Sequence, residues 1–197
     1  MINLFTPSSP KPTLGEITDK NTDIKLESAA ANASLQEASS VPTLRPLFWQ
    51  RFALDELTTV EWEALCDGCG ACCLVKFLED YDDQTDVEYT DVACRLLDCD
   101  SGYCSNYADR QQYVPDCVSL TYDKLVDMMW LPSNCAYKRL YLGKDLPEWH
   151  LLITEDAVAT QHGMRAAGVG VAGRCISEVG VGEEELEERV VTWIEVN

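Results

Sequence analysis

The sequence has few basic residues, and this scarcity limits the partners that the protein can have. Its 15 Lys and Arg stand against 34 Asp and Glu, which gives a net charge of −19 at pH 7. A surface of that sign repels the phosphates of nucleic acids and the headgroups of anionic lipids. We therefore expect neither nucleic acid nor membrane among its partners. The acidity favours solubility, and it is compatible with a bound cation or a basic protein partner.

Long apolar runs are also missing. No stretch approaches the ~18 apolar residues of a membrane-spanning helix. The first residues, Met1 to Pro7, do not show a basic stretch followed by an apolar one, so we expect no secretory signal. We predict a cytoplasmic protein, in which thiols stay reduced.

The usual catalytic and nucleotide-binding patterns are incomplete. Residues 168–173 match G-x-G-x-x-G, but no βαβ alternation surrounds them, and we predict a flexible strand or turn. Gly143-Lys144 lacks the upstream glycine of a P-loop. No Ser/His/Asp order stands out. His150 and His162 are interpreted as surface or hydrogen-bonded residues, with a ligand or acid–base role as the alternative.

Cysteine, by contrast, is abundant, with ten residues in 197. Four of them fall within eight residues, in the run Cys66-Asp-Gly-Cys69-Gly-Ala-Cys72-Cys73. Two-residue spacing turns successive sulfurs towards one point, as in zinc knuckles and iron–sulfur ferredoxins, and the glycines allow a tight wrap. In a reducing compartment this pattern indicates a metal site rather than disulfides.

Two other interpretations of this cysteine run fit its spacing less well. Buried thiols can act as small hydrophobes, but isolated burial does not explain the spacing. A thioredoxin-like pair at Cys66 and Cys69 would need a βαβ pattern before it, which the sequence lacks. Metal binding therefore remains the interpretation that the spacing favours.

Ten thiols exceed the needs of one four-coordinate ion. Neighbouring side chains diverge, so one of Cys72 and Cys73 is expected to ligate a first ion while the other faces a second ion or the core. A first site would use Cys66, Cys69, one of that pair and a distant thiol. The second would draw on Cys94, Cys104 and Cys117, with Cys135 as its fourth candidate. Tetrahedral thiolate sites suit both zinc and iron–sulfur chemistry, and both stay open. Cys99 and Cys175 are interpreted as buried thiols.

The chain divides into a tail and one domain. Residues 1–44 are rich in Ser, Thr, Ala, Asn and Pro, which predicts a disordered N-terminal tail. Residues 45–197 are predicted to form a small Cys-rich metal-binding domain. We expect an α+β fold, mainly helical, with irregular Cys-rich loops organised by metal.

Several local elements are predicted inside this domain. Thr58 and Glu61 form a capping box, so a helix is expected from there to about Gly68. The remaining expectations are an acidic loop over 79–91, helices over 121–131 and 134–142, an extended stretch over 168–177 and a final amphipathic helix over 186–194.

A set of ordered motifs also resembles a known family. They are Leu65-Cys66-Asp-Gly-Cys69-Gly-x-Cys72-Cys73-Leu74, Val92-Ala-Cys94-Arg95, Cys104-x-Asn-Tyr107, Pro115-Asp-Cys117, Cys135-Ala-Tyr137 and Gly143-Lys-Asp-Leu-Pro-x-Trp-His150. Over about residues 47–163 the chain resembles the C-x-x-C-x-x-C-C family of zinc- or iron-chelating proteins, and within it the uncharacterised bacterial YcgN-type branch.

The resemblance implies a ligand set but no activity. The ligands that it implies are Cys66, Cys69, Cys72, Cys73, Cys94, Cys104 and Cys117, with Cys135 as the addition of the branch. Cys99 and Cys175 fall outside the pattern. The family carries no assigned reaction.

The sequence thus favours a cytosolic metal-binding protein that holds zinc or iron, the latter also as an iron–sulfur cluster, through clustered thiolates. One alternative is a redox or metal-assisted enzyme that uses the same centre, with His150 or an acid of residues 79–91 as its acid–base group. The other is an interaction module in which the metal shapes a surface for a basic partner.

Overall fold

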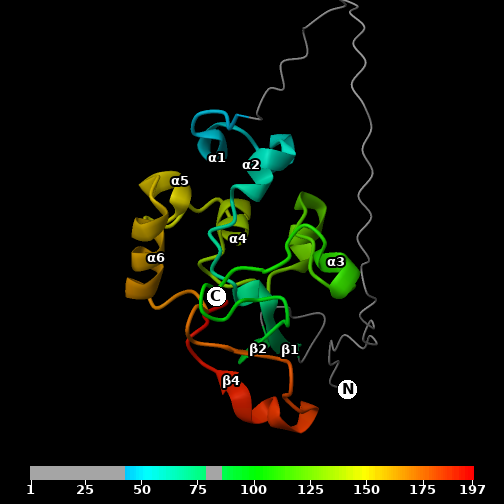
Figure 1. Ribbon diagram of the computed structural model, residues 1–197. Helices are drawn as coiled ribbons and strands as arrows, with labels where there is room; N and C mark the ends of the chain where they lie inside the picture. The colour runs from blue at the N-terminus through cyan, green and yellow to red at the C-terminus, as the bar shows by residue number, and fades with distance from the viewer. Residues whose placement is uncertain (1–42, 79–85) are drawn as a thin grey trace, which may run out of the picture. The chain divides into compact units, whose positions relative to one another are not determined.

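Figure 1 shows the chain as a computed structural model, which describes residues 43–78 and 86–197. The predicted tail over 1–44 lies outside the described residues except for its last two positions. The first part of the predicted acidic loop, residues 79–85, lies outside them too.

Short helices and a small mixed sheet make up this part of the chain. The α-helices are α1 (Phe48–Arg51), α2 (Thr59–Glu63), α3 (Arg110–Tyr113), α4 (Ala136–Tyr141), α5 (Leu151–Thr154) and α6 (Ala157–Ala166). The strands are β1 (Leu74–Leu78), β2 (Val87–Ala93), β3 (Ile176–Ser177) and β4 (Val190–Val191). Single 3-10 turns lie at Leu54–Glu56, Ala71–Cys73, Tyr122–Asp127, Glu183–Glu185 and Glu187–Arg189. The α+β class is confirmed, whereas the expectation of a mainly helical fold is not.

Strand β2 is the centre of the sheet, because the other three strands all pair with it. It is antiparallel to β1, with Leu74 opposite Ala93, parallel to β3 and antiparallel to β4. Strand β1 starts directly after Cys73, and β2 ends directly before Cys94. The pairing therefore brings these two cysteines together, and the Cys94 N–H donates to the Cys73 carbonyl at 2.9 Å.

The main core packs the helices against one face of this sheet. Tyr89 of β2 is buried, and its hydroxyl donates to the Trp130 carbonyl at 2.8 Å. The ammonium of Lys138, in α4, donates to the carbonyls of Leu131 and Val196, which ties the C-terminal segment to the loop before α4. In Figure 1, α1 and α2 lie at the end of the domain opposite the strands, and α5 and α6 lie side by side.

Helix α2 begins as the capping box predicts. The Thr58 hydroxyl accepts the Glu61 N–H at 3.3 Å, and the Glu61 carboxylate accepts the Thr58 N–H at 3.0 Å. Glu61 is buried and also binds the Arg45 guanidinium at 2.6 Å, and this hydrogen bond holds the pKa of Glu61 far below its ordinary range. The helix ends at Glu63, before the predicted stop at Gly68, and the N–H groups of Leu65 and Cys66 donate to carbonyls three residues back instead of four.

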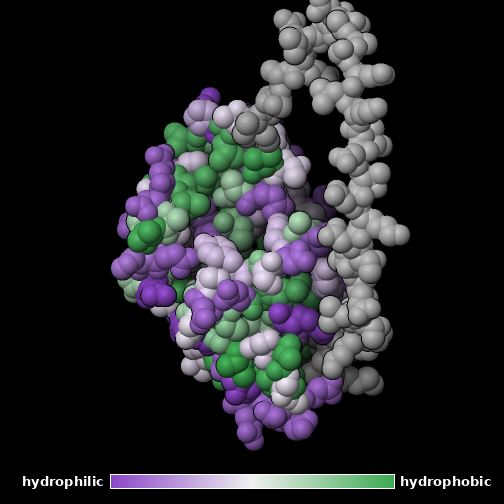
Figure 2. Space-filling view, in the orientation of Figure 1, coloured by the Kyte–Doolittle hydropathy of each residue, from purple (hydrophilic) through white to green (hydrophobic). Residues whose placement is uncertain are grey.

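The final amphipathic helix was wrongly predicted. The chain forms the two acidic 3-10 turns over 183–189 and then strand β4, because the β-branched Val190 and Val191 pair with β2. Leu186 is buried instead with Phe77 and Val92 in a small second cluster. The exposed glutamates of these turns give the hydrophilic end of the domain, which Figure 2 shows below β4.

Three further elements differ from the sequence prediction. Residues 87–91 were expected in the acidic loop and form most of β2, where Tyr89 is buried. The helix expected over 121–131 is reduced to a 3-10 turn. Only Ile176–Ser177 of the expected extended stretch is a strand, whereas α4 lies where a helix was predicted. No helix of the described residues is long and apolar enough to cross a membrane.

Candidate metal centre

The loop that carries four cysteines links α2 to β1, and two glycines in a left-handed conformation shape it. Gly68 and Gly70 both have φ of 74°. A Cβ at Gly68 would lie 2.4 Å from the Tyr103 ring, and one at Gly70 would lie 2.5 Å from a methyl of Val171 and 3.0 Å from the Gly102 carbonyl. Only glycine combines a favourable positive φ with the lack of a side chain that these close contacts require. This confirms that both positions need the backbone freedom predicted for a tight wrap.

Gly70→Ala is therefore expected to destabilise the fold by about 2–4 kcal/mol, from backbone strain together with overpacking against Val171. Gly143→Ala is a matched control, because Gly143 also has positive φ but has open space where its Cβ would lie. Strain alone predicts a loss of about 1 kcal/mol there. Urea unfolding of both variants gives the two free energies, and equal losses would contradict the role assigned to the close contact.

The first group of cysteines contains Cys66, Cys69, Cys72 and Cys135. Cys69 and Cys135 are buried, Cys72 is half-buried and Cys66 is exposed. Burial raises the pKa of Cys69 well above its ordinary value, and the nearby charges of Asp67, Cys135 and Cys72 add to this effect. Cys72 is also within electrostatic range of Cys66. Cys135, at the N-terminus of α4, is likewise within electrostatic range of Cys69 and Cys72.

The second group contains Cys73, Cys94, Cys104 and Cys117, all half-buried. Sheet pairing places Cys73 beside Cys94, and a β-bridge between Leu97 and Cys104 folds the chain back over the turn that follows Cys94. Burial raises the pKa of Cys94, and the charges of Glu178, Cys117 and Cys104 raise it further. The sulfurs of Cys72 and Cys73 are 4.0 Å apart, so these two residues join the groups.

Cys99 and Cys175 form a separate pair. Both are half-buried, and the Cys99 carbonyl accepts the Gly173 N–H at 2.6 Å. Burial raises the pKa of Cys175 to about 12, and a hydrogen bond with the Cys99 thiol contributes. All ten cysteines of the chain are free thiols. Over residues 43–78 and 86–197, no three His, Cys, Asp or Glu side chains converge closely enough to hold an ion as they stand.

Positive charge lies beside each group of thiols. The Lys76 ammonium donates to the carbonyls of Cys72 and Leu74 at 3.2 and 2.8 Å. Burial lowers the pKa of Lys76, and the charges of Cys72 and Cys73 offset part of this lowering. Cys72 has its pKa lowered to about 7, mainly by a hydrogen bond from Cys73 and also by Lys76. In the second group, the guanidinium of Arg110 lowers the pKa of Cys117, although burial raises it more.

Asp67 is a member of the site that the sequence reasoning missed. It is 6% exposed, and one carboxylate oxygen accepts the Cys69 N–H at 3.1 Å. The other oxygen, Oδ2, is buried and has no hydrogen-bond partner within the described residues. A buried oxygen of this kind is costly unless it meets a donor or a cation. Its place between Cys66 and Gly68 is the only sequence signal that could have drawn attention to it.

His150 is fully buried and does not face the thiols with a free nitrogen. Its Nδ1 accepts the Leu152 N–H at 3.1 Å, which leaves Nε2–H to donate to the Leu65 carbonyl at 2.9 Å. His162 is exposed on α6. Both positions agree with the prediction of hydrogen-bonded or surface histidines. His150 therefore orients the start of the Cys-rich loop and has no free position for ligation or proton transfer.

The arrangement of soft thiolate donors in two groups, with a buried unpaired carboxylate oxygen, defines a candidate metal-chelating protein. The model of a family described as “Putative zinc- or iron-chelating domain”, CxxCxxCC, matches residues 65–136.

Relatives that match about three quarters of the chain extend this likeness. The chain is 50% identical over 146 residues to a UPF0260 protein of Parvibaculum lavamentivorans, which covers 74% of the chain and 92% of the relative. It is 51% identical over 148 residues to one of Gluconacetobacter diazotrophicus (75% and 88%), and 44% identical over 146 residues to one of Shewanella amazonensis (74% and 94%). The protein belongs to the UPF0260 family. No solved structure matches it.

Proposed function

We propose that the protein is a cytoplasmic metal carrier or metal-stabilised protein with two thiolate centres. Cys66, Cys69, Cys72 and Cys135 would hold the first centre, and Cys73, Cys94, Cys104 and Cys117 the second. The proposal is supported by the mutual electrostatic range of cysteines from remote segments, with Cys69, Cys72 and Cys135 on one side and Cys94, Cys104 and Cys117 on the other. A tetrahedral thiolate site needs four sulfurs, and each set supplies that number.

The donor chemistry fits zinc and iron alike. Thiolates are the ligands of structural zinc and of iron–sulfur clusters, and they must lose their protons when the metal binds. Bound metal would supply a positive charge that stabilises thiolates inside a partly buried loop. Lys76 and Arg110 would offset the negative charge that remains on each centre. The unpaired Oδ2 of Asp67 would gain a favourable electrostatic partner at the first centre.

The sulfurs have to converge before either set can coordinate an ion. Cysteine side chains reach new positions by rotation about one bond, between staggered wells. The backbone supports this step, since Gly68, Gly70 and the β1–β2 pairing hold the segments in place. Metal binding would then add to the stability of a domain whose backbone is already organised.

The proposal predicts how much metal the protein carries. Protein purified without oxygen is expected to hold about two zinc ions per chain, since each ion takes four thiolates. The iron alternative predicts a brown sample with acid-labile sulfide. Elemental analysis with sulfide determination separates the two. Folded protein that carries neither metal at stoichiometric amounts would contradict the proposal.

A further inference from the structure

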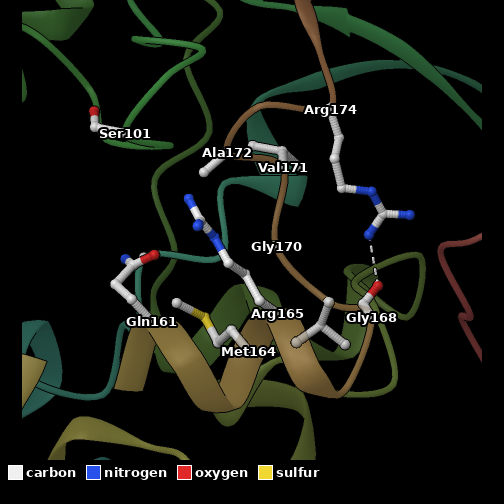
Figure 3. Close-up of a pocket in the computed structure, with 11 residues that line it drawn as sticks. Ser101, Gln161, Met164, Arg165, Gly168, Gly170, Val171, Ala172 and Arg174 are labelled. Carbon is white, nitrogen blue, oxygen red and sulfur yellow. Dashed lines mark hydrogen bonds between the residues drawn. The ribbon is translucent and has the colours of Figure 1, made fainter. Parts of the chain in front are cut away.

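A pocket of ≈ 220 Å³ lies beside the Cys-rich loop, and nothing in the proposed metal chemistry uses it. Figure 3 shows that it opens between α6, the glycine-rich segment that follows this helix, and the turn around Ser101. Gly68 of the Cys-rich loop lines it as well. Most of its wall thus comes from residues C-terminal to the stretch that the family model matches.

The charge of this pocket is opposite to that of the protein. Two of its lining residues, Arg165 and Arg174, are cationic, and none of them is acidic, although the chain carries 34 Asp and Glu. Arg174 is already engaged, since its guanidinium donates to the Gly168 carbonyl at 2.6 Å and lies 3.5 Å above the Trp193 ring. It therefore forms a fixed part of the wall.

Arg165 is different, because it has no ion-pair or hydrogen-bond partner for its side chain in the part of the chain that the structure describes. Figure 3 shows its guanidinium rising from α6 into the pocket, with the Gln161 side chain next to it and Ser101 across the space. A planar guanidinium with unused donors matches the geometry of a carboxylate or phosphate group.

The glycine-rich segment adds backbone donors to the same wall. Gly168, Gly170 and Gly173 have φ of 71°, 86° and 71°, a conformation that favours glycine. Most amides of this segment are used, for example that of Val171, which donates to the Cys69 carbonyl at 2.9 Å. Within the described residues, the amides of Gly170 and Ala172 donate to no acceptor.

We propose that this pocket binds a small oxyanion, a phosphate or a carboxylate group, between the Arg165 guanidinium and the glycine-rich segment. Gln161 and Ser101 supply further polar contacts, and Met164 forms an apolar floor. The volume limits the ligand to a small molecule or to one group of a larger one. The bond between Val171 and Cys69 connects the anion site to the Cys-rich loop, but anion binding itself requires no metal.

The test is a titration of the purified full-length protein with inorganic phosphate and, separately, with succinate, at constant ionic strength set with sodium chloride. Saturable binding is expected for one probe or both, and the probe that binds identifies the group. Amide shifts of Gly170 and Ala172, followed by NMR, locate the site. Arg165→Gln is expected to weaken binding about tenfold or more, because it removes a charge-assisted hydrogen-bond donor.

Arg51→Gln is the matched control, since it removes the same charge from an exposed position at the end of α1, far along the chain from the pocket. It is expected to bind the anion as the wild type does. Equal binding by the wild type and Arg165→Gln, or saturation by neither probe, would overturn the proposal. Metal content is measured on the same samples, so a failure of this proposal is distinct from a failure of the metal centres.

Discussion

Replacing Cys69 by serine is expected to remove about half of the bound metal and to lower the free energy of unfolding by several kcal/mol, since apparent binding energies of structural zinc reach about 10–16 kcal/mol. Cys69 is buried and has both Cys72 and Cys135 of the first group as electrostatic neighbours. A serine hydroxyl does not replace a thiolate as a ligand. Elemental analysis and thermal melting of protein purified without oxygen measure both effects.

Two further variants sharpen this experiment. Cys117→Ser belongs to the second group and is expected to remove the other half of the metal, so that the double variant holds none. Cys99→Ser is the control, because Cys99 pairs with Cys175 outside both groups and is half-buried, as Cys117 is. Unchanged metal and melting in Cys69→Ser, or an equal loss in Cys99→Ser, would refute two centres with these ligands.

The second large effect is expected from His150→Ala, with a loss of about 3–5 kcal/mol in the free energy of unfolding. The imidazole is fully buried, and its removal leaves a cavity and withdraws partners from the Leu65 carbonyl and the Leu152 N–H. The reason is structural, so the loss does not depend on which metal the protein holds.

His162→Ala is the matched control for this change. His162 is exposed on α6, and substitutions at such surface positions usually stay within ±0.5 kcal/mol. Urea unfolding of the two variants under the same metal conditions gives the comparison. A small loss at His150, close to that at His162, would show that the hydrogen bonds to Leu65 and Leu152 do not hold the Cys-rich loop.

Features that depend on residues close together in the sequence were predicted, whereas features that depend on distant residues were not. The capping box of Thr58 and Glu61 is a local device of four residues, and it was predicted correctly. The left-handed glycines of the Cys-rich loop were expected for the same reason. The end of α2 was not predicted correctly, because the helix stops at Glu63, before the expected stop at Gly68.

The prediction of a C-terminal helix was wrong because this segment pairs with a strand, which the spacing of its apolar residues does not reveal. Leu186, Val190 and Ile194 have helical spacing, but Val190 and Val191 are β-branched and find a free edge on β2. Pairing with a strand about a hundred positions earlier in the chain decided their conformation. Residues 87–91, which were expected in a loop, likewise form part of β2 because they pair with β1 and β4.

Cysteine number, spacing and the acidic composition were determined by the sequence alone, and they were enough to indicate thiolate chemistry and to place the chain in its family. Which thiols are neighbours was decided only by the tertiary structure, since it depends on the β1–β2 pairing and on α4 bringing Cys135 to the first group. The same is true of Asp67 Oδ2 and of the Arg165 pocket. These features arise from burial and from contacts between segments that are distant in the sequence, and local sequence patterns predict neither.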